Sequence, residues 1–190
     1  MKELSEMTLE ELWQLFPIIL KEHNSDYKVW YEIEKRKLIE KFGELILRIN
    51  HIGSTAVEGM IAKPTVDILM EISRDSNIDE VKERLLSMDW LLMNSTTFPK
   101  FKQTYNKGYT KIGFAEKVYH LHIRYLDDWN ELYFRDYLIE YPEVAKEYGK
   151  LKLGLWKRFE HNRDGYTEAK SDFILSVTDR ARKKYRNRYA

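Results

Sequence analysis

Two segments of the chain, 65–72 and 118–126, alternate apolar and other side chains with the period of a β-strand. In the first segment, apolar residues occupy every even position from Val66 to Ile72. In the second, they occupy the odd positions from 119 to 125. Because neighbouring residues of a strand point to opposite sides, each strand has one face for the core and one partly polar face. The residues of the two partly polar faces are Asp67, Leu69, Glu71, His120, His122 and Arg124.

The segments before the first of these strands predict mainly helices. Thr8-Leu9-Glu10-Glu11 has the form of a capping box, which predicts a helix from there to near Pro17. A short first strand is expected at 18–20. Apolar side chains at helical spacing over 26–47 predict an amphipathic helix that ends near Gly43.

A helix is also expected between the two alternating strands, from 76–79 to about Met88. Three extended segments should follow it, at 90–94, 98–105 and 109–114. Asn106-Lys107-Gly108 is predicted to form the hairpin turn between the last two. After Trp129 the pattern becomes helical, with helices expected over 129–141, 143–160 and 164–186.

Strands therefore dominate the first part of the chain and helices the last part. This order predicts an α+β fold, with a mixed sheet, helices packed on one face and C-terminal helices. We expect one domain over 1–190. Residues 1–24 would form its N-terminal helix and first strand, and 129–190 its C-terminal helices.

Composition narrows the possible classes of protein. The 190 residues carry 32 Lys and Arg against 31 Asp and Glu, which excludes a strongly polycationic or polyanionic chain. The chain has no cysteine, so thiol nucleophiles, disulfides and zinc–thiolate sites are excluded, and any metal must be held by His, Asp or Glu. An acidic N-terminal region and short apolar runs predict a cytoplasmic protein that makes no membrane contact.

The polar strand faces are the first candidates for chemistry. His120 and His122 lie two residues apart, about 6.7 Å along a strand, and could share an ion or a phosphate. Packed, hydrogen-bonded sheet histidines are the alternative. Asp67 and Glu71 share a face but are about 13 Å apart, too far to chelate one ion.

The loop 51–64 is the second candidate. It contains two glycines, Ser54, Thr55 and Lys63 between two apolar runs. Glycine lets a backbone approach an anion closely, and hydroxyl groups donate hydrogen bonds to it. The loop thus suits a phosphate, although an ordinary turn with a solvated Lys63 is an equal alternative.

Several short blocks, taken together, resemble the GrpB family. The resemblance covers about residues 25–175, and its most specific part is the run from Ile52 to Val57. The matching blocks are Ile52-Gly53-Ser54-Thr55-Ala56-Val57, Gly59, Ala62-Lys63-Pro64, Val66-Asp67-Ile68, His120-Leu121-His122, Phe134-Arg135-Asp136-Tyr137-Leu138, Tyr148 with Lys152, and Tyr166 with Lys170.

The resemblance implies a fold similar to that of the nucleotidyltransferase superfamily. In that superfamily a Gly-Ser turn holds the triphosphate, and carboxylates on strands bind two divalent ions. Gly53-Ser54 and Asp67 stand at the matching places, but Leu69 replaces the second carboxylate. A histidine stands where the third ligand is expected, and an Asp/His site favours a transition metal over magnesium.

These considerations define the expected site. Asp67, His120 and His122 are the candidate catalytic residues, and Asp67 with His122 would hold a divalent metal if one is bound. The candidate ligand-binding residues are His51, Gly53, Ser54, Thr55, Lys63 and Arg124.

Two functions are consistent with this site. The first is binding of a nucleotide or another phosphorylated small molecule, with transfer of a nucleotidyl or phosphoryl group as the reaction. The second is a catalytically inactive binding or accessory module, which Leu69 favours. Tyr166 and Lys170 could close over the pocket, or simply pack and face solvent. The basic tail 180–188 is expected to be a solvated helix end rather than a nucleic-acid arm.

Overall fold

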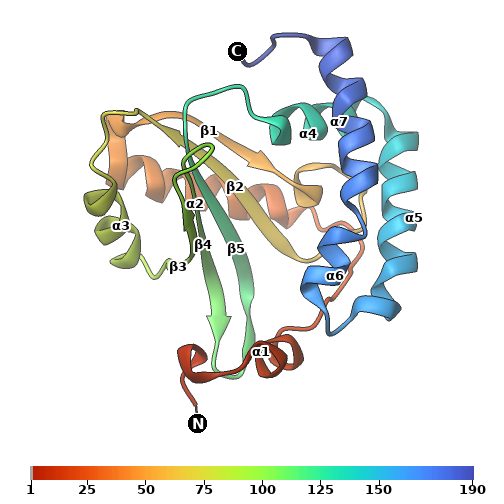
Figure 1. The fold of residues 1–190 in the computed structure, drawn as a ribbon, viewed down its shortest axis with the longest axis horizontal. Helices are drawn as coiled ribbons and strands as arrows, with labels where there is room; N and C mark the ends of the chain where they lie inside the picture. Colours follow the sequence, from red (N-terminus) through yellow and green to blue (C-terminus); the bar gives the residue numbers. More distant parts are fainter. Residues whose placement is uncertain (1) are drawn as a thin grey trace.

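The computed structural model describes residues 2–190. Five strands form one sheet, and helices lie on both sides of it (Figure 1). In chain order the elements are η1 (Leu4–Glu6), α1 (Leu9–Leu15), α2 (Asp26–Phe42), η2 (Gly43–Leu45), β1 (Ile46–Ile52), η3 (Ser54–Ala56), β2 (Thr65–Ile72), α3 (Ile78–Leu86), β3 (Leu91–Thr96), β4 (Lys102–Thr110), β5 (Gly113–Tyr125), α4 (Asn130–Glu140), α5 (Pro142–Phe159), α6 (Arg163–Glu168) and α7 (Ser171–Tyr185).

The sheet has the order β1-β2-β5-β4-β3. Strands β2 and β5 run parallel, whereas the other neighbouring pairs are antiparallel. The prediction of an α+β fold with a mixed sheet and C-terminal helices is therefore confirmed. The parallel pair is the centre of the sheet, and both alternating segments predicted from the sequence belong to it.

One face of the sheet carries the main core. Helices α2 and α3 cover this face, and the predicted apolar positions of β2 and β5 point into it. Burial of the apolar side chains on this face is the main driving force for folding. Outside this core, the capping box predicted at Thr8 is present and begins α1. The buried residues of this core are Tyr27, Tyr31, Leu38, Phe42, Val66, Ile68, Met70, Ile72, Val81, Leu85, Trp90, Phe101, Tyr105, Tyr119, Leu121 and Ile123.

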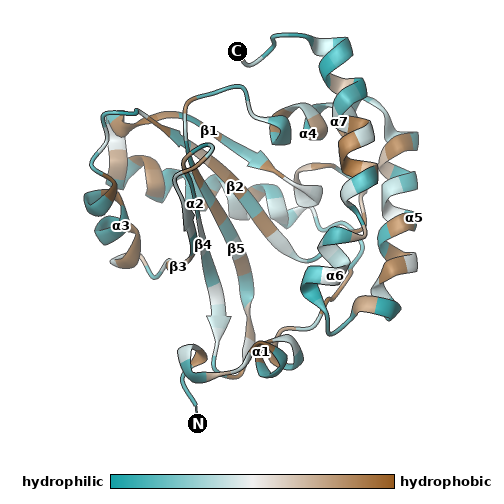
Figure 2. Cartoon of the chain, viewed as in Figure 1, coloured by the Kyte–Doolittle hydropathy of each residue, from teal (hydrophilic) through white to brown (hydrophobic). Residues whose placement is uncertain are grey.

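The C-terminal helices lie on the other side. Trp129 and Leu132, at the start of α4, pack on Leu69 and Ile52 of the sheet. Figure 2 shows apolar bands between polar ones on α5 and α7, as expected for helices with one buried stripe. These helices thus leave only part of the polar sheet face open.

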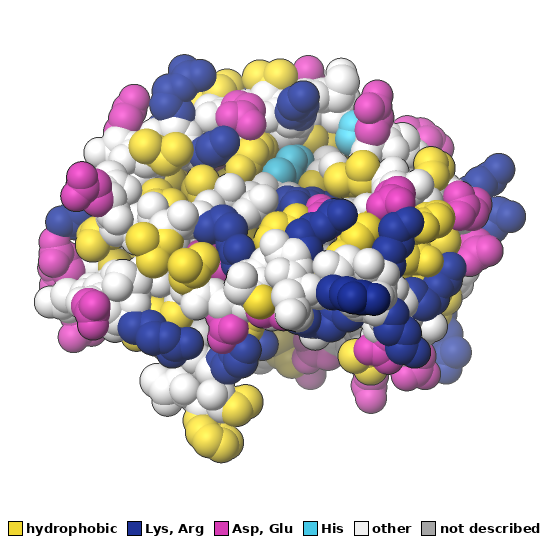
Figure 3. Space-filling model, turned by 90° about the horizontal axis from the view of Figure 1, so that it is seen from above, with side chains coloured by type: hydrophobic (Ala, Val, Ile, Leu, Met, Phe, Trp, Pro, Cys, Tyr) yellow, Lys and Arg dark blue, Asp and Glu magenta, His cyan; other side chains and the backbone are white. Residues whose placement is uncertain are grey.

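The basic tail packs against α4. Nη1 of Arg182 lies 2.6 Å from Oδ2 of Asp128, and Nη1 of Arg188 lies 2.9 Å from Oδ2 of Asp136. Figure 3 shows Lys and Arg side chains gathered on the side of the molecule where the C-terminal helices lie. Part of the tail's charge is therefore used inside the fold. Within residues 2–190, no helix is both long and apolar enough to cross a membrane.

Four predicted elements are wrong. The extended segment expected at 109–114 is not a strand of its own, because β4 ends at Thr110 and β5 begins at Gly113. Residues 18–20 do not form a strand, because no strand lies beside them; Ile18 and Leu20 instead pack on Tyr166. The segment 106–108 lies inside β4, where Gly108 sits at a register irregularity, and the hairpin turn comes after Thr110. The helix expected over 164–186 is split into α6 and α7.

Candidate functional site

The register of β2 and β5 brings Asp67, His120 and His122 together. Asp67 is paired with His120 across the parallel strands, and Leu69 with His122. Nδ1 of His120 lies 3.2 Å from Oδ1 of Asp67. Nε2 of His122 lies 3.4 Å from the same oxygen. Two imidazoles therefore face one carboxylate oxygen.

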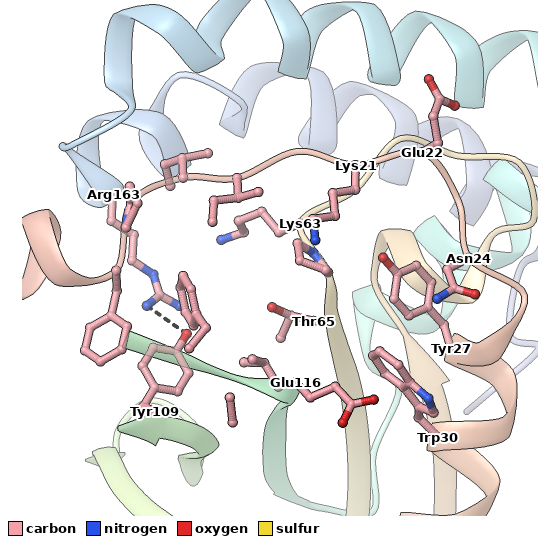
Figure 4. A pocket seen from close by; sticks show the side chains of 18 residues that line it. Lys21, Glu22, Asn24, Tyr27, Trp30, Lys63, Thr65, Tyr109, Glu116 and Arg163 are labelled. Carbon is pink, nitrogen blue, oxygen red and sulfur yellow. Dashed lines mark hydrogen bonds between the residues drawn. The ribbon is translucent and has the colours of Figure 1, made fainter. Parts of the chain in front are cut away.

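His120 connects Asp67 with Tyr109 of β4. Its Nε2 atom lies 2.8 Å from the Tyr109 hydroxyl and 3.3 Å from Nη2 of Arg163. A guanidinium can only donate, so we assign Nε2 as the acceptor and Nδ1 as the nitrogen that donates to Asp67. Arg163 also donates to the Tyr109 hydroxyl, over 3.3 Å (Figure 4). Asp67, His120 and Tyr109 thus form a hydrogen-bonded chain.

The surroundings of these groups set their charge states. Burial raises the pKa of Asp67, but the hydrogen bonds from His120 and His122 outweigh burial and hold that pKa far below its usual range. Burial lowers the pKa of His120, against the opposing effect of Asp67. Burial raises the pKa of the Tyr109 hydroxyl. At neutral pH the chain is therefore a carboxylate, a neutral imidazole and a protonated phenol, which is the state required of a general base.

Gly53 brings the loop after β1 against Asp67. Its backbone has φ 72° and ψ −173°, a conformation that is essentially restricted to glycine. A Cβ at this position would lie 2.7 Å from Oδ2 of Asp67. The next residues hold the loop in place: Ser54 accepts a hydrogen bond from Lys152 over 2.9 Å, and buried Thr55 donates to the carbonyl oxygen of Thr65 over 3.0 Å.

Four cations surround this region, and we call Lys63, Lys152, Arg163 and Lys170 the basic cluster. Lys152 of α5 is only 3% exposed and donates to Ser54 and to the carbonyl oxygen of Ile61. The ammonium groups of Lys63 and Lys170 lie 5.9 and 4.2 Å from the centre of the Tyr166 ring. Among residues 2–190, no Asp or Glu forms an ion pair with any member of the cluster.

Burial and mutual repulsion weaken the protonation of the three lysines. Burial lowers the pKa of Lys63 and of Lys152 to about 7, and that of Lys170 to about 8. The positive charges of Arg163 and Lys170 contribute to the shift of the Lys63 pKa. Those of Lys170 and Lys63 contribute to the shift of the Lys152 pKa. The cluster is therefore a set of neighbouring, partly desolvated cations that an anion would stabilise.

A cavity of about 400 Å³ adjoins this cluster. Lys63, Arg163 and Tyr109 line it, together with residues from the segment 16–24 that connects α1 to α2. Figure 4 shows Arg163 and Tyr109 at one end of the cavity, with two aromatic side chains at the other end. These aromatic side chains are Tyr27 and Trp30. The cavity thus has Arg163 and Tyr109 at one end, and Lys21, Glu22 and Glu116 line it as well.

Three predicted ligand-binding residues lie away from the basic cluster, namely Arg124, His51 and Thr55. Arg124 is 5% exposed, donates to the carbonyl oxygens of Gln103 and Ile123, and lies 5.7 Å from the centre of a Trp129 ring. The structure does not bring it to the basic cluster.

His51 points to the opposite side of the sheet. It stacks on Tyr31 at a ring separation of 4.9 Å, and its Nε2 atom lies 2.9 Å from the Thr55 hydroxyl. Burial lowers the pKa of His51 to about 4, so its ring is neutral at physiological pH. His51 and Thr55 thus support the glycine loop from behind, and neither is brought to the basic cluster.

The residues present do not fit a two-metal site. Leu69, at the place of the second carboxylate, is fully buried and packs on Trp129. Glu71 is committed to Arg48, with its Oε1 2.7 Å from Nη2. Within residues 2–190, no group of three or more His, Cys, Asp or Glu side chains is arranged to hold a metal ion.

Sequence reasoning missed two residues of the site. Arg163 and Tyr109 were not singled out, because Arg163 lies in the break between two predicted helices and Tyr109 near a misplaced turn. Lys152 and Lys170 could be noticed in the sequence only because they belong to blocks that match the GrpB family. Each of them follows a tyrosine by four residues. A search for cations at helical spacing from aromatic residues would have found both lysines but neither Arg163 nor Tyr109.

Similar proteins support one family. Residues 17–180 match the GrpB protein family. Glutamate-rich protein GrpB of Alkalihalophilus pseudofirmus is 32% identical over 164 residues, which cover 84% of this chain and 93% of that protein. UPF0157 protein YqkA of Bacillus subtilis is 29% identical over 87% of this chain. The chain spans about half the length of YqkA, 48%.

One solved structure gives the same result. The crystal structure of conserved protein GrpB from Enterococcus faecalis has a TM-score of 0.77 and 29% identity, and covers 88% of this chain and 99% of that one. A structure of the Cid1 poly(U) polymerase has a TM-score of 0.47 and 10% identity over 76% of this chain and 43% of that one, from which no activity follows. The match over residues 17–180 and the shared structure show that the chain belongs to the GrpB family.

Proposed function

We propose that the chain binds a nucleotide or another phosphorylated small molecule beside the Gly53-Ser54 turn, and that His120, oriented by the Asp67 carboxylate, acts as base and then acid in transfer of a phosphoryl or nucleotidyl group. One observation carries this proposal: four cations lie around the Gly53-Ser54 turn and the Asp67–His120 pair, and none of them is ion-paired within residues 2–190. Partly desolvated cations that outnumber the carboxylates beside them are costly, so a phosphate-bearing ligand would stabilise the site.

The hydrogen-bonded chain supplies the proton transfer. Asp67 accepts a hydrogen bond from Nδ1–H of His120, which leaves the Nε2 lone pair directed toward Tyr109. A hydroxyl of the acceptor substrate beside Tyr109 would attack phosphorus while its proton passes to the Tyr109 oxygen and the Tyr109 proton passes to Nε2. The bond from phosphorus to the leaving oxygen breaks, and the basic cluster stabilises the negative charge that leaves. His120 then returns its proton to solvent or product.

Calorimetric titration with nucleoside triphosphates tests binding, with and without Mg²⁺, Mn²⁺ or Zn²⁺. Heat of binding is expected for at least one triphosphate, and silence in every combination would contradict the proposal. Tyr109→Phe tests the chemistry: it should lower turnover about a hundredfold or more while phosphate binding stays. Phe114→Leu is the matched control, because Phe114 packs beside the Tyr109 ring, at a centroid distance of 5.3 Å, and has no hydroxyl.

The metal at Asp67 and His122 stays a prediction. The two side chains offer only two protein donors, and Asp67 Oδ1 already accepts from His120. Titration of the parent chain and of His122→Ala with Zn²⁺ and Mn²⁺ decides it. A site that is lost in the variant supports the prediction, and equal binding by both proteins contradicts it.

Leu69 favours a second function, that of an inactive binding module. A buried leucine cannot replace a metal-binding carboxylate, and no other carboxylate within residues 2–190 takes its place. Such a module would bind phosphorylated ligands without turnover. Asp67→Asn separates the two functions: a variant that binds but no longer turns over supports the enzyme, whereas a parent chain that binds without any turnover supports the module.

A further inference from the structure

The charges of the site also bear on how many phosphate groups the ligand has and on whether a divalent metal ion accompanies it. In two-metal sites, divalent ions neutralise the phosphate chain. Here the position of the second carboxylate is occupied by buried Leu69, and Glu71 is held by Arg48. The charge that metals would supply is instead present on side chains, three lysines and one arginine.

We propose that the basic cluster binds a chain of two or three phosphate groups, as in a nucleoside di- or triphosphate, without a divalent metal ion. This inference rests on the proposed function and names its ligand class. When the cluster is fully protonated it carries four positive charges, and the negative charge that acts on Lys63 and Lys170 is that of Asp67. A single phosphate contributes about 1.5 to 2 negative charges at neutral pH, so at least two phosphates are needed to balance the remainder.

The arrangement of the cations also suits a chain rather than a single phosphate. Lys152 is fixed to Ser54 of the glycine turn, and Arg163 is fixed to Tyr109 and His120 at the acid–base end. Lys63 and Lys170 approach the same ring, that of Tyr166. Their charges act on each other and on the outer members, so the four cations form a continuous group from the turn to the acid–base pair.

Tyr166 provides a second, independent observation. Its side chain is fully buried between these lysines and the N-terminal segment. Within residues 2–190, its hydroxyl has no hydrogen-bond partner. A buried hydroxyl without a partner costs free energy that a ligand oxygen would recover. The cluster therefore offers a donor as well as positive charge.

Bound anions should also change protonation. Lys63 and Lys152 have pKa values of about 7, so each is only partly protonated at neutral pH. A polyphosphate beside them raises these pKa values, and binding takes up protons from solvent. An uptake approaching one proton per ligand at pH 7 is expected, about half from each lysine.

The experiment compares AMP, ADP, ATP and inorganic tripolyphosphate by calorimetry in buffers of different ionisation enthalpy, first in EDTA and then with Mg²⁺. We expect binding in EDTA, ATP at least about tenfold tighter than AMP, and proton uptake. Mg²⁺ should weaken ATP binding, because it neutralises part of the ligand charge. Lys170→Gln should weaken ATP binding about 10- to 100-fold, the value of one charge-assisted hydrogen bond.

Lys150→Gln is the matched control, since Lys150 is an exposed lysine of the same helix as Lys152 and should leave binding unchanged. Lys170 is only partly buried, so its variant is expected to fold, which thermal unfolding checks. Binding of ATP only with Mg²⁺, or equal affinity for AMP and ATP, would overturn this inference and leave the proposed function intact. Failure of every phosphate compound to bind would overturn both.

Discussion

Replacement of Gly53 by alanine tests the contact on which the site depends. The alanine would occupy a backbone conformation of φ 72° and ψ −173°, which costs about 1–3 kcal/mol for a residue with a side chain. Its Cβ would also lie 2.7 Å from Oδ2 of Asp67, so the carboxylate must move. For a chain of this length, that cost lowers the unfolding temperature by about 2–12 °C.

Gly59→Ala is the matched control. Gly59 also has a positive φ, 75°, but a Cβ there would have no atom within 4 Å. Both variants should therefore lose stability in urea or thermal unfolding, and only Gly53→Ala should disturb Asp67. Nitrogen-15 NMR of the His120 ring reports this difference, because displacement of Asp67 removes the acceptor that selects the Nδ1–H tautomer. If both variants keep the parent tautomer and lose equal stability, the contact with Asp67 has no effect.

The remaining predictions concern charge and burial. The stability of the ligand-free chain should rise from about pH 7 to about pH 9, because Lys63 and Lys152, with pKa values of about 7 in the folded chain, hold protons in the unfolded state up to about pH 10.4. Thermal unfolding across this range measures the slope, and a flat profile would contradict the lysine pKa values. Polyphosphate affinity should fall over the same range as the lysines lose their charge, which titration at several pH values checks. Leu69→Asp should not create a metal site but should destabilise the chain by several kcal/mol, because it buries an unpaired carboxylate under Trp129. Urea unfolding of this variant with and without Mg²⁺ tests that expectation; unchanged stability would show that the position tolerates a charge.

The local sequence was sufficient for the elements whose pattern repeats. The alternation in 65–72 and 118–126 predicted both central strands and their core faces, because a strand exposes every second residue to the same side. Prediction from local sequence failed at 18–20, where an apolar run has no neighbouring strand to pair with. It also failed at 106–108, where Gly108 lies at a register irregularity inside β4 and not in a turn.

The candidate site residues were likewise predicted only in part. Sequence placed Asp67, His120, His122, Gly53, Ser54 and Lys63 as candidates from strand faces, a glycine loop and a family resemblance. It also proposed Arg124, which lies beside Trp129. It proposed His51 and Thr55 as well, which hydrogen-bond to each other behind the glycine loop. A helix that is distant in sequence can cover a polar side chain on a strand face. The alternation of apolar and polar residues along the strand does not predict where that helix packs.

The sequence by itself determined the periodic elements, the absence of cysteine chemistry and the loss of the second carboxylate at Leu69. Only the tertiary structure decided that β2 and β5 are paired so that His120 meets Asp67, and that α5, α6 and α7 bring Lys152, Arg163 and Lys170 to them. The physical reason is the separation along the chain of the residues that interact. Strand and helix periods are set by neighbours along the chain, whereas the charge balance of a site is set by groups nearly a hundred residues apart that only packing brings together.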